Sequence, residues 1–589
     1  MRERNCRLYD YFSGPLRICP APVLAKVGVT ILSSVLPAVQ ALTTAAFVDM
    51  ALALFAGRVG AEALIPSLLV LLVLMLYDNL SGTLGQLLTD RIRLRVDRAC
   101  RGWALEQRAA LKYWYVEDND TWDLITRTAD KLPERMRIGF DSLVQLAGIV
   151  FQIVSVMGIV FAQAWWIGAV MLACFVPLLF LALKGGKATY QGQVEAERHR
   201  RRADYLAKVL SGRESVEERA LFGYGGEINR EWYEKFEQAR KTQLKVDMKY
   251  FIRMKSGSLA AVAFTTLICG LLLAPVARGS MTAGAFIGLL TALGSLYSLL
   301  SWGLAYYAKE MANGREFLKD VNKFLALERQ EDALALPAGG EELRLLEFDH
   351  VSFRYPGSEH YILKGFCLSV TPGLHYAFVG VNGAGKTTVT KLLTGMFDYE
   401  GSIRLNGKEL REIPLPKRKA MFSVVYQDFA RYQISLEENI RLGDAAHMDR
   451  DALPAAEQAG LAERIAALPR GIATDLGKAR EGGVDLSGGE WQRAAIARAL
   501  QSPAPVRILD EPTAALDPMA ESRVYETFGE MSKGHTTIFI THRLGAARLA
   551  DTIVVLDEGR AAELGSHNEL IALGGIYARM FESQRSWYQ

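Results

Sequence analysis

The sequence GVNGAGKTT, residues 380–388, decides what kind of fold the second half of this chain adopts. It matches the pattern G-x-x-x-x-G-K-[ST], in which glycines let successive backbone N–H groups curl around phosphate oxygens. The apolar run 376–379 before it is typical of a strand, and 389–396 after it is typical of a helix whose N-terminus adds positive potential. The segment therefore predicts a phosphate-binding loop, with Lys386 on the β- and γ-phosphate oxygens and Thr387 offering a hydroxyl to Mg²⁺.

Two further predicted strands in the same half end in residues suited to ATP hydrolysis. Residues 506–509 lead into Asp510 and Glu511, and residues 537–541 lead into His542. Hydrolysis needs one carboxylate near Mg²⁺ and another group that positions the attacking water, and Asp510 and Glu511 fit these tasks in that order. The imidazole of His542 could hold the γ-phosphate, although a single histidine at a strand end is more often structural.

A family resemblance joins these motifs. The segment LSGGEWQR, residues 486–493, resembles the signature motif of ATP-binding-cassette (ABC) proteins, and Tyr355 resembles their aromatic residue that stacks on adenine. Gln427 resembles the glutamine between the magnesium site and the membrane domain, and residues 515–517 resemble the loop that crosses the dimer axis. The resemblance implies ATP and Mg²⁺ as cofactors, Glu511 and His542 as catalytic residues, Thr387, Gln427 and Asp510 as metal residues, and a nucleotide-binding set of Tyr355, Gly380, Asn382, Gly383, Ala384, Gly385, Lys386, Thr387, Thr388, Gln427, Ser487, Gly488, Gly489 and Asp517.

The signature motif also predicts a partner. Ser487 and the N–H groups of Gly488 and Gly489 begin a helix whose positive end can bind a γ-phosphate. In the family, that phosphate belongs to ATP held by the opposite subunit, so we expect this chain to pair with a second ABC half-transporter. Some positions depart from the family pattern: Glu490 replaces the usual glutamine, Ala514 replaces a common serine, and 474–483 lacks the usual acidic and glycine pattern. A homodimer and a heterodimer with unequal sites both stay open.

The first half of the chain is predicted to cross a membrane. Crossing the hydrocarbon core takes roughly 20 apolar residues, and six segments meet or approach this length: 23–48, 63–87, 142–162, 165–184, 256–277 and 281–307. The third and fourth are joined so briefly that a single buried hairpin is a competing interpretation. Lys and Arg concentrate in 88–140 and 185–255, which places these stretches and both chain ends in the cytoplasm. We therefore expect a multi-pass protein of the plasma membrane, surrounded by lipid.

The two long cytoplasmic connections have helical composition, so each can extend two membrane helices into the cytosol. Their tips fall near 117–122 and 213–218, where either a short transverse helix pressing on another domain or an ordinary surface loop is expected. Asp49 is expected to be solvated near the outer interface. Asp78 lies deeper in an apolar segment, which favours either a role on the substrate pathway or a hydrogen bond to a neighbouring helix.

Together these patterns predict a multidomain fold: an all-α six-helix transmembrane domain over 1–330, a linker over 331–344, and an α/β P-loop NTPase domain of the ABC type over 345–589. A short interfacial helix is expected at 8–18. The net charge of +3 gives no reason to expect a nucleic-acid partner. The six cysteines contain no Cys-x-x-Cys pair and no histidine at ligand spacing, so we interpret them as reduced packing residues rather than as a zinc site.

The expected function is ATP-driven export of a peptide, lipid or hydrophobic small molecule by a dimer that alternates between inward- and outward-facing states. An importer of metal chelates or siderophores on the same fold is the alternative. A membrane-tethered ABC regulator and an ATP-gated channel are alternatives from other classes. The sequence does not name the transported molecule.

Overall fold

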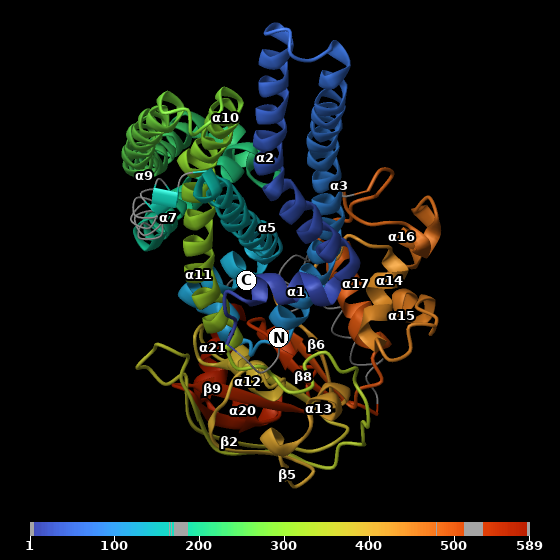
Figure 1. The fold of residues 1–589 in the computed structure, drawn as a ribbon. Coiled ribbons are helices and arrows are strands. Elements are labelled where there is room, and N and C mark those ends of the chain that lie inside the picture. Colours follow the sequence, from blue (N-terminus) through green and yellow to red (C-terminus); the bar gives the residue numbers. More distant parts are fainter. Residues whose placement is uncertain are drawn as a thin grey trace. The chain divides into compact units, whose positions relative to one another are not determined.

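The computed structural model describes residues 5–163, 165, 166, 168, 169, 186–478, 480–511 and 534–585 (Figure 1). The chain divides into two compact units. One comprises Met1–Arg108 and Asp123–Leu327, and the other comprises Ala109–Trp122 and Glu328–Gln589. The second unit therefore includes a short segment from the first half of the chain, namely the first of the two tips at which a transverse helix is predicted.

Long helices build the first unit. They are α1 (Asp10–Ile18), α2 (Pro20–Phe55), η1 (Ala61–Leu64), α3 (Ile65–Ala109), α5 (Asn119–Gln163), α7 (Gly186–Ser211), η2 (Arg213–Ser215), α8 (Val216–Phe222), α9 (Gly225–Ala277), α10 (Ala283–Ser298), the π-helical η3 (Leu299–Leu304) and α11 (Ala305–Leu325). The helix predicted near the N-terminus is α1. The α2 and α3 helices form a hairpin in which Lys26 Nζ donates to Gly85 O at 3.1 Å (Figure 1).

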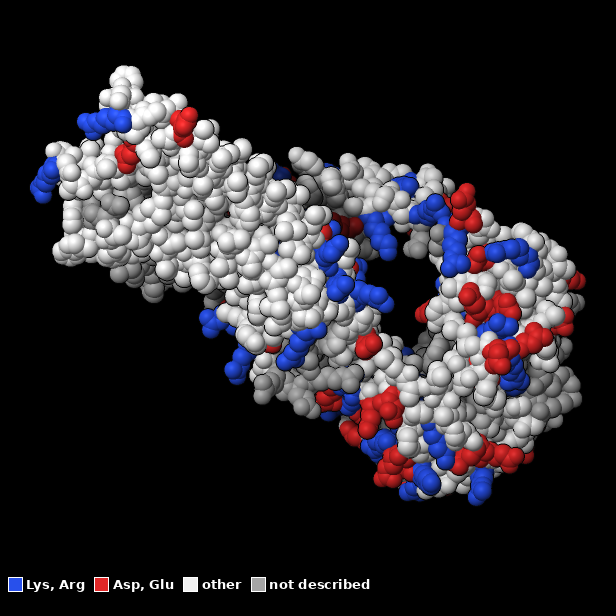
Figure 2. All heavy atoms as spheres, turned by 45° about the vertical axis from the view of Figure 1, so that its right-hand side comes forward, with Lys and Arg blue, Asp and Glu red and all other residues white. Residues whose placement is uncertain are grey.

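Three helices in the described part of the chain are long and apolar enough to cross a membrane: Pro20–Phe55, Ala61–Ala109 and Asn119–Ala162. The most apolar stretch of Ala61–Ala109 has a mean hydropathy of 2.0, and none of it is buried within the chain. Most of the fourth predicted segment lies outside the described residues. The fifth and sixth correspond to shorter apolar helical stretches, Thr265–Ala277 and Ala283–Tyr297. Figure 2 shows a long stretch of surface almost without charged side chains, as outward-facing apolar helices require.

The two carboxylates noted in apolar segments differ in their surroundings. Asp49 is half-buried rather than fully solvated, because its Oδ2 accepts from Thr282 Oγ1 at 2.7 Å and its Oδ1 accepts from Gly284 N at 2.9 Å. It therefore satisfies donors at the N-terminus of α10, where the helix dipole favours a negative charge. Asp78 is exposed on α3.

Two sheets lie in the second unit. The six-stranded sheet has the order β10-β9-β3-β8-β7-β6, and the four-stranded antiparallel sheet has the order β2-β1-β4-β5. The strands are β1 (Leu346–Phe353), β2 (Leu363–Val370), β3 (His375–Val379), β4 (Glu400–Leu405), β5 (Lys408–Glu409), β6 (Phe422–Val425), β7 (Val506–Asp510), β8 (Thr536–Ile540), β9 (Thr552–Asp557) and β10 (Arg560–Gly565). Every residue of β7 and β8 is buried, and the apolar residues 508–509 and 538–540 form the middle and end of these strands.

Helices accompany these sheets. They are α4 (Trp114–Glu117), α12 (Lys386–Leu393), η4 (Leu410–Glu412), α13 (Leu415–Met421), α14 (Leu436–Arg441), η5 (Leu442–Asp444), α15 (Leu453–Gln458), α16 (Ala462–Ala467), η6 (Gly471–Ala473), α17 (Gly488–Gln501), α19 (Leu544–Ala547), α20 (His567–Leu573) and α21 (Ile576–Arg585). Because β3, β7 and β8 are parallel and adjacent, the segments that follow them emerge at one edge of the sheet. That edge carries the predicted site.

Candidate active site

The phosphate-binding loop connects β3 to α12, as its sequence predicts. Gly380 has no room for a side chain, because a Cβ there would lie 2.2 Å from Leu556 O. Gly383 and Gly385 have φ angles of 84° and 103°, a region that L-residues with side chains rarely adopt. The glycines are thus required by the path of the loop as well as by the approach of a ligand.

Lys386 begins α12 with its side chain directed back onto the loop. Only 5% of its surface is exposed, and Nζ donates to Gly380 O at 2.9 Å and to Val381 O at 3.2 Å. Burial lowers the pKa of the ammonium group, an effect opposed by the charges of Glu511 and Asp510. The loop carbonyls therefore hold a buried cation beside two carboxylates.

Asp510 and Thr387 form a polar pair beneath the loop. Thr387 Oγ1 donates to Asp510 Oδ1 at 3.1 Å, and Asp510 is 1% exposed. Its other oxygen, Oδ2, is buried without a hydrogen-bond partner among the described residues. Burial raises the pKa of this carboxyl to about 6, although the Thr387 hydrogen bond and nearby lysines act in the opposite direction. An unpartnered carboxylate oxygen next to a hydroxyl suits a hard divalent cation such as Mg²⁺.

Glu511 and His542 come together from the ends of neighbouring strands. His542 Nε2 lies 2.5 Å from Glu511 Oε1. The backbone of Glu511 has a φ of 46°, and its N–H donates to Ile540 O at 3.0 Å, which fixes the side chain beyond the end of β7. Burial is the main cause of a lowered pKa for His542, with Lys386 adding to it and Glu511 opposing it.

Lys386, Thr387, Glu511 and His542 line one cavity of about 630 Å³, and Asp510 lies buried behind Thr387. Its lining residues are Tyr355, Ile362, Asn382, Gly383, Gly385, Lys386, Thr387, Thr388, Gln427, Glu511 and His542. The structure therefore brings together predicted residues from α12 and from the segments after β1, β3, β6, β7 and β8. Gly380 and Ala384 shape the loop without lining the cavity. Ile362 was missed by sequence reasoning, since an apolar residue just before a strand carries no chemical motif.

Tyr355 lies in an aromatic group at one side of the cavity. Its hydroxyl lies 3.2 Å from Thr388 Oγ1, and its ring packs edge-on against Phe353 and Phe397 with centroids 5.0 and 5.4 Å apart. Lys391 Nζ lies 5.4 Å from the centre of the Tyr355 ring. An aromatic face held in this way is suited to stacking on a planar base.

Lys391 also connects this aromatic group to α4 within the second unit. Its Nζ lies 3.0 Å from Glu117 Oε1 and 5.7 Å from the centre of the Tyr113 ring. Tyr113 in turn packs edge-on against Phe397 at 5.5 Å. The tip at Ala109–Trp122 thus contains a short helix that contacts the nucleotide unit, which is the transverse-helix alternative rather than the free surface loop.

The signature segment lies at the start of α17, outside the lining of the cavity. Ser487 is the N-cap of the helix: its N–H donates to Glu490 Oε2 at 2.7 Å, and its Oγ accepts from Glu490 N at 3.3 Å. Arg464 Nε lies 3.2 Å from Glu490 Oε1. The unusual acid is therefore held by a capping box and an arginine, while Ser487 and Gly488 stay exposed. Asp517 and Ala514 lie outside the described residues.

Comparisons with known proteins cover both halves of the chain. The family model described as "ABC transporter" matches residues 363–514, and the model described as "ABC transporter transmembrane region" matches residues 24–300. An ATP-dependent lipid A-core flippase of Alkalilimnicola ehrlichii is 45% identical over 242 residues, which are 41% of this chain and 41% of that protein. Another, from Chromobacterium violaceum, is 30% identical over 485 residues, 80% of each chain.

A solved structure agrees with the fold. The structure of a bacterial Atm1-family ABC exporter with ATP bound matches with a TM-score of 0.76 and 24% identity, covering 95% of this chain and 98% of that one. At this identity the match concerns the fold alone. Together with the motifs, these matches show that the chain belongs to the ABC transporter family, as a half-transporter that carries a transmembrane region and an ATP-hydrolysing region in one polypeptide.

Proposed function

We propose that this chain is one subunit of a dimeric exporter that uses ATP hydrolysis to move an amphiphilic lipid across the plasma membrane. The observation that carries the proposal is the cavity in which the phosphate-binding loop, Gln427, Glu511 and His542 meet, while the signature helix begins at an exposed position elsewhere. In this proposal the chain crosses the membrane several times and its nucleotide-binding unit lies in the cytoplasm.

Each residue of the site has a task that follows from its chemistry. Lys386 balances phosphate charge, and the backbone N–H groups of the glycine loop bind phosphate oxygens. Thr387, Asp510 and Gln427 hold Mg²⁺, which when bound neutralises charge on the β- and γ-phosphates. Glu511 orients the attacking water, and His542, kept in place by Glu511, contacts the γ-phosphate. The Tyr355 ring stacks on adenine.

The signature residues act on a second chain in this proposal. The exposed N-terminus of α17 presents Ser487 and the N–H groups of Gly488 and Gly489 to the γ-phosphate held by the other subunit. Asp517 belongs to the same interface. Because Lys386, Glu511 and His542 are all present, the chain supplies a competent half-site to a copy of itself or to a different half-transporter.

A lipid is the proposed cargo because two relatives that match this chain are named as lipid A-core flippases, one of them over 80% of its length. The apolar outward face of α3 is compatible with a path along the lipid. The proposed cargo is therefore amphiphilic lipids as a class.

Reconstitution in proteoliposomes tests this function. Lipid A-core, phospholipids, peptides and metal chelates are added in parallel, and both the ATPase rate and the movement of a labelled cargo are measured. The proposal expects stimulation by the lipid and ATP-dependent movement away from the nucleotide-binding side, with Glu511→Gln as the inactive control. Movement toward that side would identify an importer, and ion currents that persist in Glu511→Gln at constant ATP would identify a channel.

A further inference from the structure

A group of three possible metal ligands lies on the antiparallel sheet, away from the residues that line the nucleotide cavity. In the pairing of β1 with β2, Phe348 faces Leu368 and Val351 faces Phe366. Asp349 and His350 therefore both face the single residue Cys367. This is a β-bulge, in which two residues on one strand oppose one on its neighbour, so side chains that would normally alternate between faces are brought to one place.

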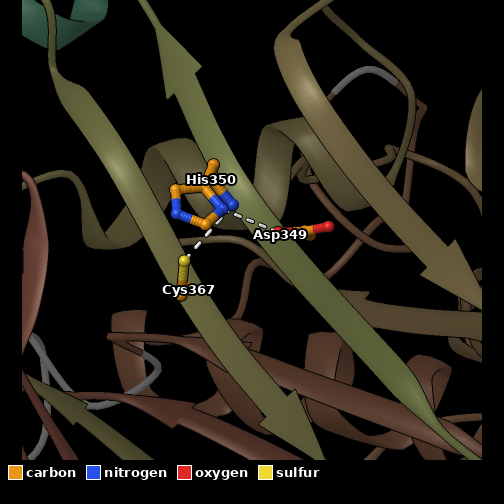
Figure 3. A group of neighbouring side chains, drawn as sticks. All are labelled: Asp349, His350 and Cys367. Atoms are coloured by element: carbon orange, nitrogen blue, oxygen red, sulfur yellow. Dashed lines mark hydrogen bonds and ion pairs between the residues drawn. The ribbon is translucent and has the colours of Figure 1, made fainter.

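The three residues are in contact. His350 Nδ1 lies 2.7 Å from Asp349 Oδ1, and the backbone N–H of His350 donates to Cys367 Sγ at 3.3 Å. One ligand atom from each residue lies within 4.8 Å of the others. Figure 3 shows the His350 ring between Asp349 on its own strand and Cys367 on the neighbouring strand. The donors thus converge before any ion is present.

The backbone adopts an unfavourable conformation at His350 to hold this arrangement. His350 has a φ of 50°, in the left-handed region that a residue with a side chain adopts only when its surroundings require it. On the other side of β1, Gly401 makes room for the bulge: a Cβ there would lie 2.4 Å from His350 O. The glycine and the unusual conformation of His350 together keep both side chains beside Cys367.

We propose that Asp349, His350 and Cys367 bind a Zn²⁺ ion. Thiolate, imidazole and carboxylate are the ligands that zinc takes in proteins, at about 2.0–2.3 Å from the metal, so ligand atoms of one tetrahedral ion lie about 3–4 Å apart. Small side-chain rotations bring the present group to that separation, and water supplies the fourth ligand. Mg²⁺ prefers oxygen ligands, so this site is chemically distinct from the one at Asp510.

The surroundings suit an accessible ion site. Cys367 is the exposed thiol among the described cysteines, which also include Cys6, Cys19, Cys100 and Cys269. His350 and Asp349 have side-chain exposures of 81% and 47%, so an ion can reach them from solvent. Arg404 lies 3.5 Å from Asp349 Oδ2, which leaves Oδ1 as the oxygen that faces His350. Binding releases the thiol proton to solvent, and the imidazole contributes a lone pair from its unprotonated nitrogen.

Zinc titration of the full-length chain, purified without a histidine tag and kept in lipid with excess Mg²⁺, tests the site. We expect one tight Zn²⁺ per chain, with affinity reduced more than about tenfold in Cys367→Ala and in His350→Asn. Asparagine tolerates the left-handed conformation, so His350→Asn removes the ligand and keeps the bulge. The matched control is His447→Asn, because His447 Nδ1 also lies beside a carboxylate, 3.1 Å from Asp444 Oδ1, but is not part of the group.

A second measurement needs no variant. Cys367 is alkylated by iodoacetamide in the folded chain, and Zn²⁺ is expected to slow that reaction at least tenfold, while Mg²⁺ does not. Mass spectrometry of the peptide that contains Cys367 gives the extent of reaction. Unchanged alkylation in Zn²⁺, or a tight Zn²⁺ that both site variants retain, overturns the proposal. If only the His447→Asn variant loses that Zn²⁺, the proposal is overturned as well.

Discussion

We propose that the cavity around Lys386 and the start of the signature helix at Ser487 both bind phosphate, yet they are built in opposite ways. Lys386 is 5% exposed, and its ammonium group donates to loop carbonyls. Ser487 and Gly488 are exposed, and their helix begins outside the lining of the cavity. One chain completes the first motif by itself. The second motif favours an anion at its helix N-terminus, but no pocket of the same chain surrounds it. We call the cavity around Lys386 the enclosed motif and the start of the signature helix at Ser487 the exposed motif. The difference between them favours a site that two chains share.

The largest predicted effect concerns Glu511 in the enclosed motif. Glu511→Gln keeps the shape of the side chain but removes the carboxylate that is proposed to orient water, so ATP hydrolysis should fall by about 10²–10⁴-fold. Nucleotide binding should persist because Lys386 and the loop are intact. Phosphate release and binding of labelled ATP measure the two properties. A variant that hydrolyses ATP at more than a tenth of the normal rate would remove Glu511 from the proposed role.

The shared-site idea itself is tested by mixing two variants. Lys386→Ala damages the enclosed motif and Ser487→Arg damages the exposed one, so dimers of either variant alone should be inactive. If two copies of this chain form the dimer, a mixed dimer contains one intact site, made of the loop from one chain and the signature from the other. Equal co-expression should then restore about a quarter of the normal ATPase rate.

The control for this experiment is co-expression of Lys386→Ala with Lys386→Met, which leaves no intact loop and should stay inactive. If Ser487→Arg alone retains full activity, the signature does not act on ATP. If normal chains alone hydrolyse ATP but the mixture of the two variants does not, the two motifs do not complement each other across chains. Both results would contradict the comparison between an enclosed and a shared motif.

The enclosed motif was largely predictable from the sequence, for physical reasons. Parallel strands buried on both faces need mainly apolar sequence, and the apolar residues 376–379, 508–509 and 538–540 supply it in β3, β7 and β8. A loop that wraps phosphate needs glycine at fixed spacing, and strands that run in parallel bring their carboxyl ends to one edge. These local requirements are enough to place Lys386, Asp510 and His542 together at that edge of the sheet.

The contacts that escaped prediction depend on packing between distant segments. Lys391 and Glu117 are separated by 274 positions and share no motif, so only the docking of α4 in the second unit pairs them. His350 and Cys367 are 17 positions apart, outside the usual zinc spacings, and meet because of a bulge that the strand pattern does not reveal. Asp49 caps α10, which begins more than 200 residues later. Apolar composition located membrane helices but not these polar contacts.

A third prediction uses the burial of the enclosed motif. Native Asp510 keeps its proton up to about pH 6, whereas the unfolded carboxyl loses it near 3.8. Between these pH values the native chain binds more protons than the unfolded chain, so the free energy of unfolding decreases as pH rises. Above pH 6 the carboxyl is charged in both states, and the full cost of burying that charge lowers the stability of the native state. Asp510→Asn should therefore be more stable above pH 6, by up to about 3 kcal/mol, with the difference disappearing below pH 4.

Thermal unfolding of both proteins without nucleotide or Mg²⁺, from pH 4 to pH 8, measures this effect. The asparagine variant should also lose ATP hydrolysis, because the buried charge that lowers stability is the charge that is proposed to hold Mg²⁺. A difference in unfolding temperature that stays constant over the whole pH range would mean that the Asp510 charge is not the cause.

The smallest predicted effect lies in the exposed motif and separates two roles of Glu490. Its carboxylate caps Ser487 and pairs with Arg464, and it also places negative charge beside the proposed γ-phosphate position. Glu490→Gln can keep the capping box but removes the charge. Because a partly exposed ion pair contributes only about 1 kcal/mol, stability should change little, and the KM for ATP should decrease by about two- to fivefold.

Glu490→Ala is the matched variant, since it removes the charge and the cap together. It should lower the stability of the nucleotide-binding unit by about 1 kcal/mol, which the glutamine variant does not. Steady-state ATPase kinetics and thermal unfolding of the two variants distinguish the roles. If KM decreases equally in both, the charge acts on ATP independently of the cap. If KM is unchanged in Glu490→Gln, the acid serves the helix and Arg464, and the exposed motif tolerates it because its charge is already neutralised within the chain.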